Sequence, residues 1–112
     1  MSDLEFDLDL GHGHTLRWLR WAPDRDLNPQ YVTVPDIDRY GATIHHTSPA
    51  GEACNGGIVF DTPEVAALHA ISGGNRHATW QVASWEPLTL SPSILCSCGD
   101  HGFIRDGQWV AA

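Results

Sequence analysis

The first residues of the chain, D-L-E-F-D-L-D-L at positions 3–10, alternate strictly between acidic and apolar side chains. Successive residues of an extended strand point to opposite faces, so the alternation gathers the apolar side chains on a single face. Those side chains are Leu4, Phe6, Leu8 and Leu10. The pattern therefore predicts a half-buried β-strand at the start of the chain.

Short apolar patterns of the same kind recur along the sequence. They predict further strands at residues 15–21, 31–34, 40–46, 58–60 and 79–85, and an extended segment at residues 88–96 that is interrupted by Pro92. The stretch 48–57, S-P-A-G-E-A-C-N-G-G, is expected to be a loop that holds Cys54. Asp106-Gly107, between F-I-R and Q-W-V, is typical of a tight β-hairpin, so residues 103–110 should close the fold as a hairpin.

One segment predicts a helix. Thr62-Pro63-Glu64 offers a capping hydroxyl, a proline in the first turn and an acid near the positive end of the helix dipole. Gly73-Gly74 can supply the left-handed conformation that ends such a helix. We expect one domain over residues 1–112, of class α+β and mostly β. It should contain a small antiparallel sheet, one short helix, and a zinc-ribbon-like knuckle with its C-terminal hairpin.

Composition excludes some functions. Fourteen acidic residues against six basic ones, all arginine, give a net charge of −8, which disfavours binding to nucleic acid. No apolar run approaches the roughly 20 residues needed to span a bilayer, so no membrane association is expected. The acidic N-terminus does not resemble a secretion signal. Three cysteines in such a chain are better explained as thiols or metal ligands than as disulfides.

The stretch Cys98-Gly-Asp-His101 has the spacing of a metal-binding knuckle. Two ligands separated by two residues can reach one ion where the chain turns tightly, and glycine permits that turn. A second half-site is offered by His45-His46 and, after a loop, Cys54. We therefore predict a tetrahedral Zn²⁺ site, with the ligands His46, Cys54, Cys98 and His101.

The fourth ligand stays open at this stage, since His45 or Cys96 could replace His46. His46 is favoured over His45 because adjacent strand residues point to opposite faces. Cys54 and Cys96 could instead be small buried apolar residues. A second histidine motif, Gly11-His12-Gly13-His14, could chelate an ion, but without a known neighbour it is better explained as a solvated turn. Proximity to residues 96–101 would change that interpretation.

The C-terminal stretch S-P-S-I-L-C-S-C-G-D-H-G-F-I-R-D-G-Q-W resembles the signature of a small uncharacterised family found in bacteria and in actinobacterial phages. The signature comprises S-P-S-I, C-x-x-H, an aromatic residue with isoleucine, and a glycine before the last strand. Its positions here are Ser91, Pro92, Ser93, Ile94, Cys98, His101, Phe103, Ile104 and Gly107. The resemblance implies a zinc-ribbon-like site and a β-rich fold, and some bacterial relatives are encoded near ubiquitin-like conjugation components.

Three functions follow from these observations. The favoured hypothesis is a zinc-stabilised, non-catalytic protein-interaction module, encoded by a phage, located in the bacterial host cytoplasm, and able to associate with itself. The alternative is a virion component, such as a minor capsid, decoration or tail protein. The third is a zinc-dependent hydrolase with Glu52 or Asp100 as general base, which lacks the H-E-x-x-H signature of a metalloprotease.

Overall fold

The computed structural model describes residues 5–73 and 78–112, and within them the chain is mainly β-structure. The early strands are β1 (Leu8–Gly11), β2 (His14–Trp21), β3 (Ile37–Thr47) and β4 (Ala53–Asp61). A short 3₁₀ turn, η1 (Pro29–Tyr31), lies between β2 and β3, and the helix α1 (Pro63–Ser72) follows β4. The later strands are β5 (Trp80–Trp85), β6 (Leu88–Ser91), β7 (Ile94–Leu95), β8 (His101–Arg105) and β9 (Gln108–Ala111).

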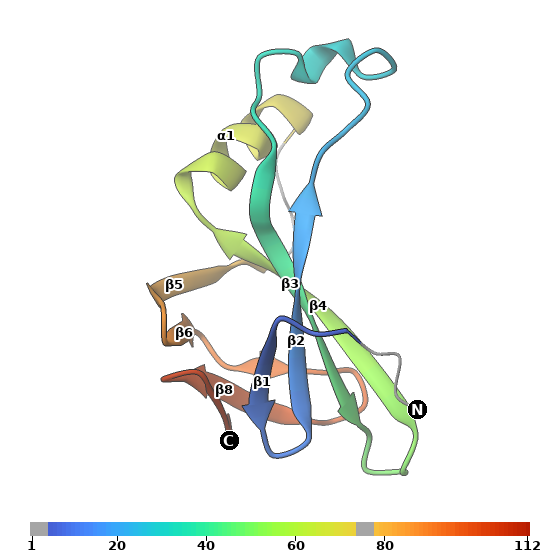
Figure 1. The fold of residues 1–112 in the computed structure, drawn as a ribbon, viewed down its shortest axis with the longest axis vertical. Coiled ribbons are helices and arrows are strands. Elements are labelled where there is room, and N and C mark those ends of the chain that lie inside the picture. The colour runs from blue at the N-terminus through green and yellow to red at the C-terminus, as the bar shows by residue number, and fades with distance from the viewer. Residues whose placement is uncertain (1–4, 74–77) are drawn as a thin grey trace.

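The strands form two sheets (Figure 1). The larger sheet has the order β1-β2-β3-β4-β5-β6, and the smaller has the order β7-β8-β9. All neighbouring pairs are antiparallel except β4 and β5, which are parallel because the connection through α1 brings the chain back across the sheet. In Figure 1, α1 lies near one end of the long β2–β3 pair and the smaller sheet lies near the other end.

The expected fold class is confirmed: the chain is mostly β, with one short α-helix in the described residues. Asp106 and Gly107 both have positive φ, 51° and 75°, as the predicted two-residue hairpin turn requires. The Thr62 hydroxyl accepts a hydrogen bond from the Val65 N–H, and Gly73 ends the helix with φ 97°. Gly74 and residues 3–4 of the predicted first strand lie outside the described residues.

Two predictions of local structure were wrong. Residues 31–34 form turns rather than a strand, since the Val32 N–H donates to the carbonyl of Pro29 and the Val34 N–H to that of Tyr31. The stretch around Cys54 is not a loop, because β4 already begins at Ala53. Pairing with β3 extends this strand through the two glycines, at positions 56 and 57, that had suggested a loop.

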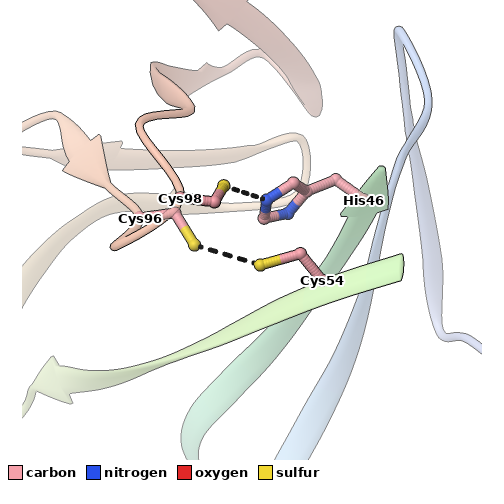
Figure 2. A group of neighbouring side chains, drawn as sticks. All are labelled: His46, Cys54, Cys96 and Cys98. Atoms are coloured by element: carbon pink, nitrogen blue, oxygen red, sulfur yellow. Dashed lines mark hydrogen bonds between the residues drawn. The ribbon is translucent and has the colours of Figure 1, made fainter. Parts of the chain in front are cut away.

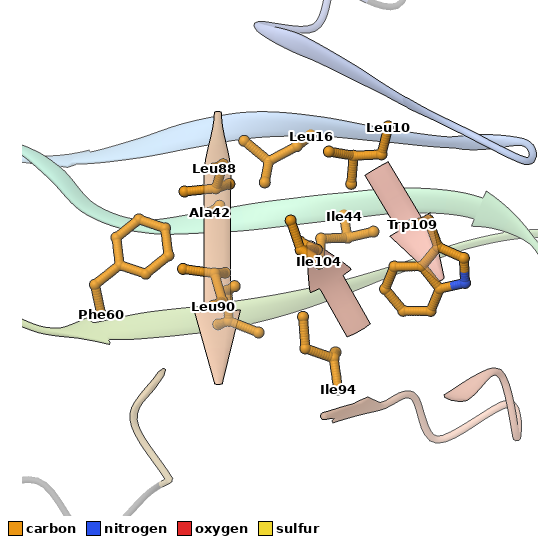
Figure 3. Close-up of a cluster of buried hydrophobic side chains, with 11 residues drawn as sticks. Leu10, Leu16, Ala42, Ile44, Phe60, Leu88, Leu90, Ile94, Ile104 and Trp109 are labelled. Carbon is orange, nitrogen blue, oxygen red and sulfur yellow. The ribbon is translucent and has the colours of Figure 1, made fainter. Parts of the chain in front are cut away.

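The main hydrophobic core lies between the two sheets (Figure 3). Its buried side chains come from both sheets: Leu10, Leu16, Ala42, Ile44, Ile58, Phe60, Leu88, Leu90, Ile94, Ile104 and Trp109. A second, smaller cluster lies under the helix and contains Val34, Ile37, Val65 and Leu68. Within the part of the chain described here, no helix has the length and apolar character needed to cross a membrane.

Candidate functional site

Two ligand-type side chains face each other across the β3–β4 hairpin. His46 of β3 is paired directly with Cys54 of β4. Directly opposite residues of antiparallel strands carry their side chains on the same face, about 4.5–5.5 Å apart at Cβ. The pairing therefore places an imidazole and a thiol side by side. His45 is paired with Asn55 and lies on the opposite face of the sheet.

The other two cysteines come from the tight turn between β7 and β8. The Cys96 N–H donates to the carbonyl of Asp100 at 2.8 Å, and the Gly99 N–H donates to the carbonyl of Cys96 at 2.9 Å. Gly99 has φ 99°, a conformation that a side chain would disfavour. The turn closes on itself and directs both cysteines toward the hairpin of β3 and β4 (Figure 2).

His46, Cys54, Cys96 and Cys98, here called the Cys₃His cluster, place their ligand atoms within 4.8 Å of one another. His46 Nε2 lies 3.2 Å from Cys98 Sγ, and Cys54 Sγ lies 3.6 Å from Cys96 Sγ (Figure 2). Two sulfurs bound tetrahedrally to Zn²⁺ at about 2.3 Å would lie about 3.8 Å apart. The cluster can therefore hold a metal ion with little rearrangement, whereas a disulfide needs an S–S distance of about 2 Å.

The two facing thiols of the cluster have different acidities. The hydrogen bond between the two sulfurs, together with burial, raises the pKa of Cys54 to about 11. The pKa of Cys96 is lowered, chiefly because the backbone N–H of Cys98 donates to its sulfur. The contact between the two sulfurs is thus a hydrogen bond that shares one thiol proton. A divalent cation would replace that proton, since thiolates are the metal-binding form of cysteine.

The structure brings together three of the four residues predicted as ligands, His46, Cys54 and Cys98. The fourth member of the group is Cys96, which sequence analysis had named as an alternative. His101 is not part of this group. It follows the turn as the first residue of β8, and its side chain is exposed.

The His101 imidazole instead contacts a serine. His101 Nε2 lies 2.9 Å from Ser93 Oγ. Leu95 is paired with His101 across β7 and β8, so side chains at positions 93, 95 and 101 share the outer face of the small sheet. The main chain of Ser93 and that of His101 are each held by a hydrogen bond. The Trp80 indole donates to the Ser93 carbonyl at 3.3 Å, and the Ala112 N–H donates to the His101 carbonyl at 3.0 Å.

A serine hydroxyl hydrogen-bonded to an imidazole nitrogen is the arrangement that activates serine as a nucleophile. Sequence analysis did not identify it, because it had assigned His101 to the metal and had given Ser93 no role. A serine and a histidine eight positions apart carry no specific signal. The stretch that resembles a family signature contains both Ser93 and His101, but it was interpreted only as a metal-binding motif.

The fold and the site thus define a small β-rich protein with a Cys₃His cluster and an adjacent serine–histidine pair. The chain belongs to the family described as bacterial ubiquitination-like system serine protease (BubE), whose model matches residues 26–112. No curated protein and no solved structure matches the chain.

The family corrects the favoured functional hypothesis. A non-catalytic, phage-encoded interaction module was predicted, and the family instead indicates a protease. Metal-dependent hydrolysis was the hydrolytic function expected to be possible, and the chain lacks its usual motif. A nucleophilic serine needs no metal at the reacting bond, and it was not among the expected functions.

Proposed function

We propose that this protein is a serine protease of a bacterial ubiquitin-like modification system, with Ser93 as nucleophile and His101 as general base. The main support is the 2.9 Å contact between Ser93 Oγ and His101 Nε2, at an exposed position on the small sheet. The distance falls within the range expected for a nucleophile and its base. The family assignment gives the reaction class.

The proposed reaction follows from the two side chains. Ser93 Oγ attacks the carbonyl carbon of the scissile bond, while its proton passes to His101 Nε2. When the tetrahedral intermediate collapses, the same proton passes to the leaving group, and an ester links the substrate's acyl group to Ser93. Water then attacks this ester with His101 again as base, which releases the acid and restores the serine. In the described residues, no carboxylate is hydrogen-bonded to the other ring nitrogen of His101.

The proposed cofactor is one Zn²⁺ in the Cys₃His cluster. Three thiolates and one imidazole are a common donor set for structural zinc, and four protein ligands leave no open position for a substrate. The ion would stabilise the turn of residues 96–100, which lies between Ser93 and His101 in the sequence. We therefore assign the metal a structural role: through Cys96 and Cys98 it would hold the turn that separates the two reacting side chains.

The proposed substrate is a protein of the same modification system, either a precursor or a conjugate. The earlier expectation of another protein as partner fits this proposal. The net charge of −8 disfavours nucleic acid as a substrate or partner. A cytoplasmic location is proposed, because ubiquitin-like modification systems act on intracellular proteins.

Labelling with a fluorophosphonate, a reagent that reacts with activated serines, tests the proposal. The zinc-loaded wild-type protein should acquire one adduct, which peptide mass spectrometry should locate on Ser93. Ser93→Ala should abolish labelling, and His101→Ala should slow it by at least about a thousandfold.

Ser91→Ala provides the matched control, since Ser91 is an exposed serine two positions away at the end of β6. This variant should react like the wild type. All variants should retain one zinc per chain by elemental analysis, which shows that the fold is intact. Undiminished labelling of Ser93→Ala, or none of the wild-type protein, would overturn the proposal.

A further inference from the structure

The Gly-His-Gly-His segment forms the turn between β1 and β2, and it is not the solvated motif that its sequence suggested. Gly11, His12 and Gly13 have φ values of 74°, 53° and 76°. Three successive residues with positive φ reverse the chain tightly, which glycine permits. The turn directs His14 inward, where only 7% of the residue is exposed.

Both ring nitrogens of His14 have polar partners. Nδ1 lies 2.8 Å from the carbonyl oxygen of His12, and Nε2 lies 2.7 Å from Oδ2 of Asp100. A carbonyl oxygen only accepts, so Nδ1 carries a hydrogen. The short contact between Nε2 and the carboxyl group is a second hydrogen bond, in a partly buried place, so the ring is held at both of its nitrogens.

The His14 ring also stacks on two neighbouring rings. It stacks on Trp109, with a centroid distance of 4.1 Å and an interplanar angle of 11°, and on His46, at 5.3 Å and 20°. Trp109 in turn packs against Gly102, where a Cβ atom would lie 2.5 Å from the indole. The His14 ring therefore has little freedom to rotate, and it contacts a member of the Cys₃His cluster directly.

Asp100 connects this buried pair to the exposed serine–histidine pair. Its carboxyl group is held by His14, and its carbonyl accepts the Cys96 N–H that closes the turn. His101 is the next residue and starts β8. Because neighbouring residues of an extended chain point to opposite sides, an Asp100 side chain fixed inward directs the His101 side chain outward, toward Ser93.

We propose that His14 and Asp100 form a positioning pair that sets the orientation of His101 for the reaction at Ser93. This inference rests on the proposed function. The family model matches residues 26–112, so His14 lies outside the match. The proposal therefore gives the hairpin of β1 and β2 a role in the reaction that the family match does not include. A hydrogen-bonding residue behind a reacting group commonly changes rate by about 10- to 100-fold.

The test compares three variants of the full, zinc-loaded chain in fluorophosphonate labelling of Ser93. His14→Ala removes the donor to Asp100. His14→Gln keeps an N–H that can reach the carboxyl group. His12→Asn is the matched control, since it changes the exposed histidine of the same turn, keeps the carbonyl that His14 uses, and asparagine tolerates positive φ.

We expect His14→Ala to lower the maximal rate of labelling about tenfold or more, with half-maximal reagent concentration and zinc content unchanged. His14→Gln should recover part of the loss, and His12→Asn should match the wild type. The double variant His14→Ala/Asp100→Ala should be no slower than the slower single variant, because the two residues act as a unit.

Other outcomes overturn the inference in distinguishable ways. A wild-type labelling rate for His14→Ala would remove the pair from the reaction while leaving the proposed protease intact. A lower rate that is accompanied by an equal loss of zinc would mean that His14 only supports the metal. If the wild-type protein itself is not labelled, the proposed function fails, and the inference fails with it.

Discussion

The two ends of the molecule are stabilised in different ways. At the helix end, around α1, the hydrogen bond that begins the helix is local: the cap joins Thr62 to Val65, three positions apart. At the cluster end, His46 meets Cys98 across 52 positions, Cys54 meets Cys96 across 42, and His14 meets Asp100 across 86. Local hydrogen bonds can form in isolation, whereas the cluster end requires the complete sheet.

The difference has a consequence for function. The helix end buries a small apolar cluster and carries none of the residues proposed for catalysis. The cluster end adds a dense set of polar contacts to one side of the main hydrophobic core, and the serine–histidine pair lies on its outer face. Polar groups need exact partners when buried, so this end should be the more sensitive to small changes.

The largest effect should come from metal removal. Loss of the proposed Zn²⁺, by chelation or by Cys54→Ala, should expose the amides of β7, β8 and β9 to hydrogen exchange while α1 keeps more of its protection. Structural zinc contributes about 10–16 kcal/mol in small zinc-finger peptides, more than the roughly 2–5 kcal/mol of a typical core truncation.

His101→Ala is the informative control for this experiment, since it should retain zinc and protection while losing reactivity at Ser93. Full loss of zinc from His101→Ala would instead support the ligand set expected from sequence. If chelation leaves the exchange of β7–β9 unchanged, the proposed structural role of the metal is wrong.

Gly102→Ala should have the next largest effect, again at the cluster end. The new Cβ would lie 2.5 Å from the Trp109 ring and 2.7 Å from the carbonyl oxygen of Val110, so the indole that supports His14 must move. Overpacking of this kind usually costs about 1–3 kcal/mol. Urea denaturation should report the loss. Gly57→Ala provides the control, since its Cβ would meet no atom within 4 Å.

Thr62→Ala should be milder and confined to the helix end. It removes the hydroxyl that accepts the Val65 N–H, and loss of such a cap costs about 1 kcal/mol. Thr62→Ser should restore most of the stability measured by urea denaturation. Labelling of Ser93 and zinc content should not change. A loss of reactivity in Thr62→Ala would show that the two ends are coupled more tightly than their contacts indicate.

The smallest effect should come from the exposed charges beside η1. Arg25 and Arg20 both bind Asp36, at 2.8 Å and 2.9 Å, and the hydrogen bond from Arg25 is the main reason that the pKa of Asp36 is lowered. A lowered carboxyl pKa stabilises the fold above the ordinary aspartate pKa, and the contribution disappears as pH falls through the folded-state value. Asp36→Asn should therefore lower Tm slightly near neutral pH.

Two conditions should reduce that difference in Tm between Asp36→Asn and the wild type. It should shrink as the pH falls below the ordinary aspartate pKa and the carboxyl group takes up a proton, and it should shrink in high salt, which screens exposed charges. Thermal melts under matched conditions would measure both trends. A difference that grows as the pH falls would contradict the assigned role of Arg25.

The accuracy of the sequence-based predictions follows the same division between local and long-range contacts. The capped helix, the Asp-Gly hairpin and the β-rich class were predicted correctly because adjacent residues encode them. The pair of glycines after Cys54 suggested a loop, yet pairing with β3 made a strand. The turns at residues 31–34 are an exception to this division: their hydrogen bonds span three positions, but the tyrosine and valines favour extended structure, so the pattern predicted a strand.

The sequence by itself determined which donor atoms are available for a metal and which short segments favour a strand, a turn or a helix. Only the tertiary structure decided that Cys96 joins the metal-binding group, that His101 contacts Ser93, and that His14 is buried against Asp100. The physical reason is strand register. A shift of one residue turns each side chain to the opposite face, and register is set by packing and pairing across the whole sheet.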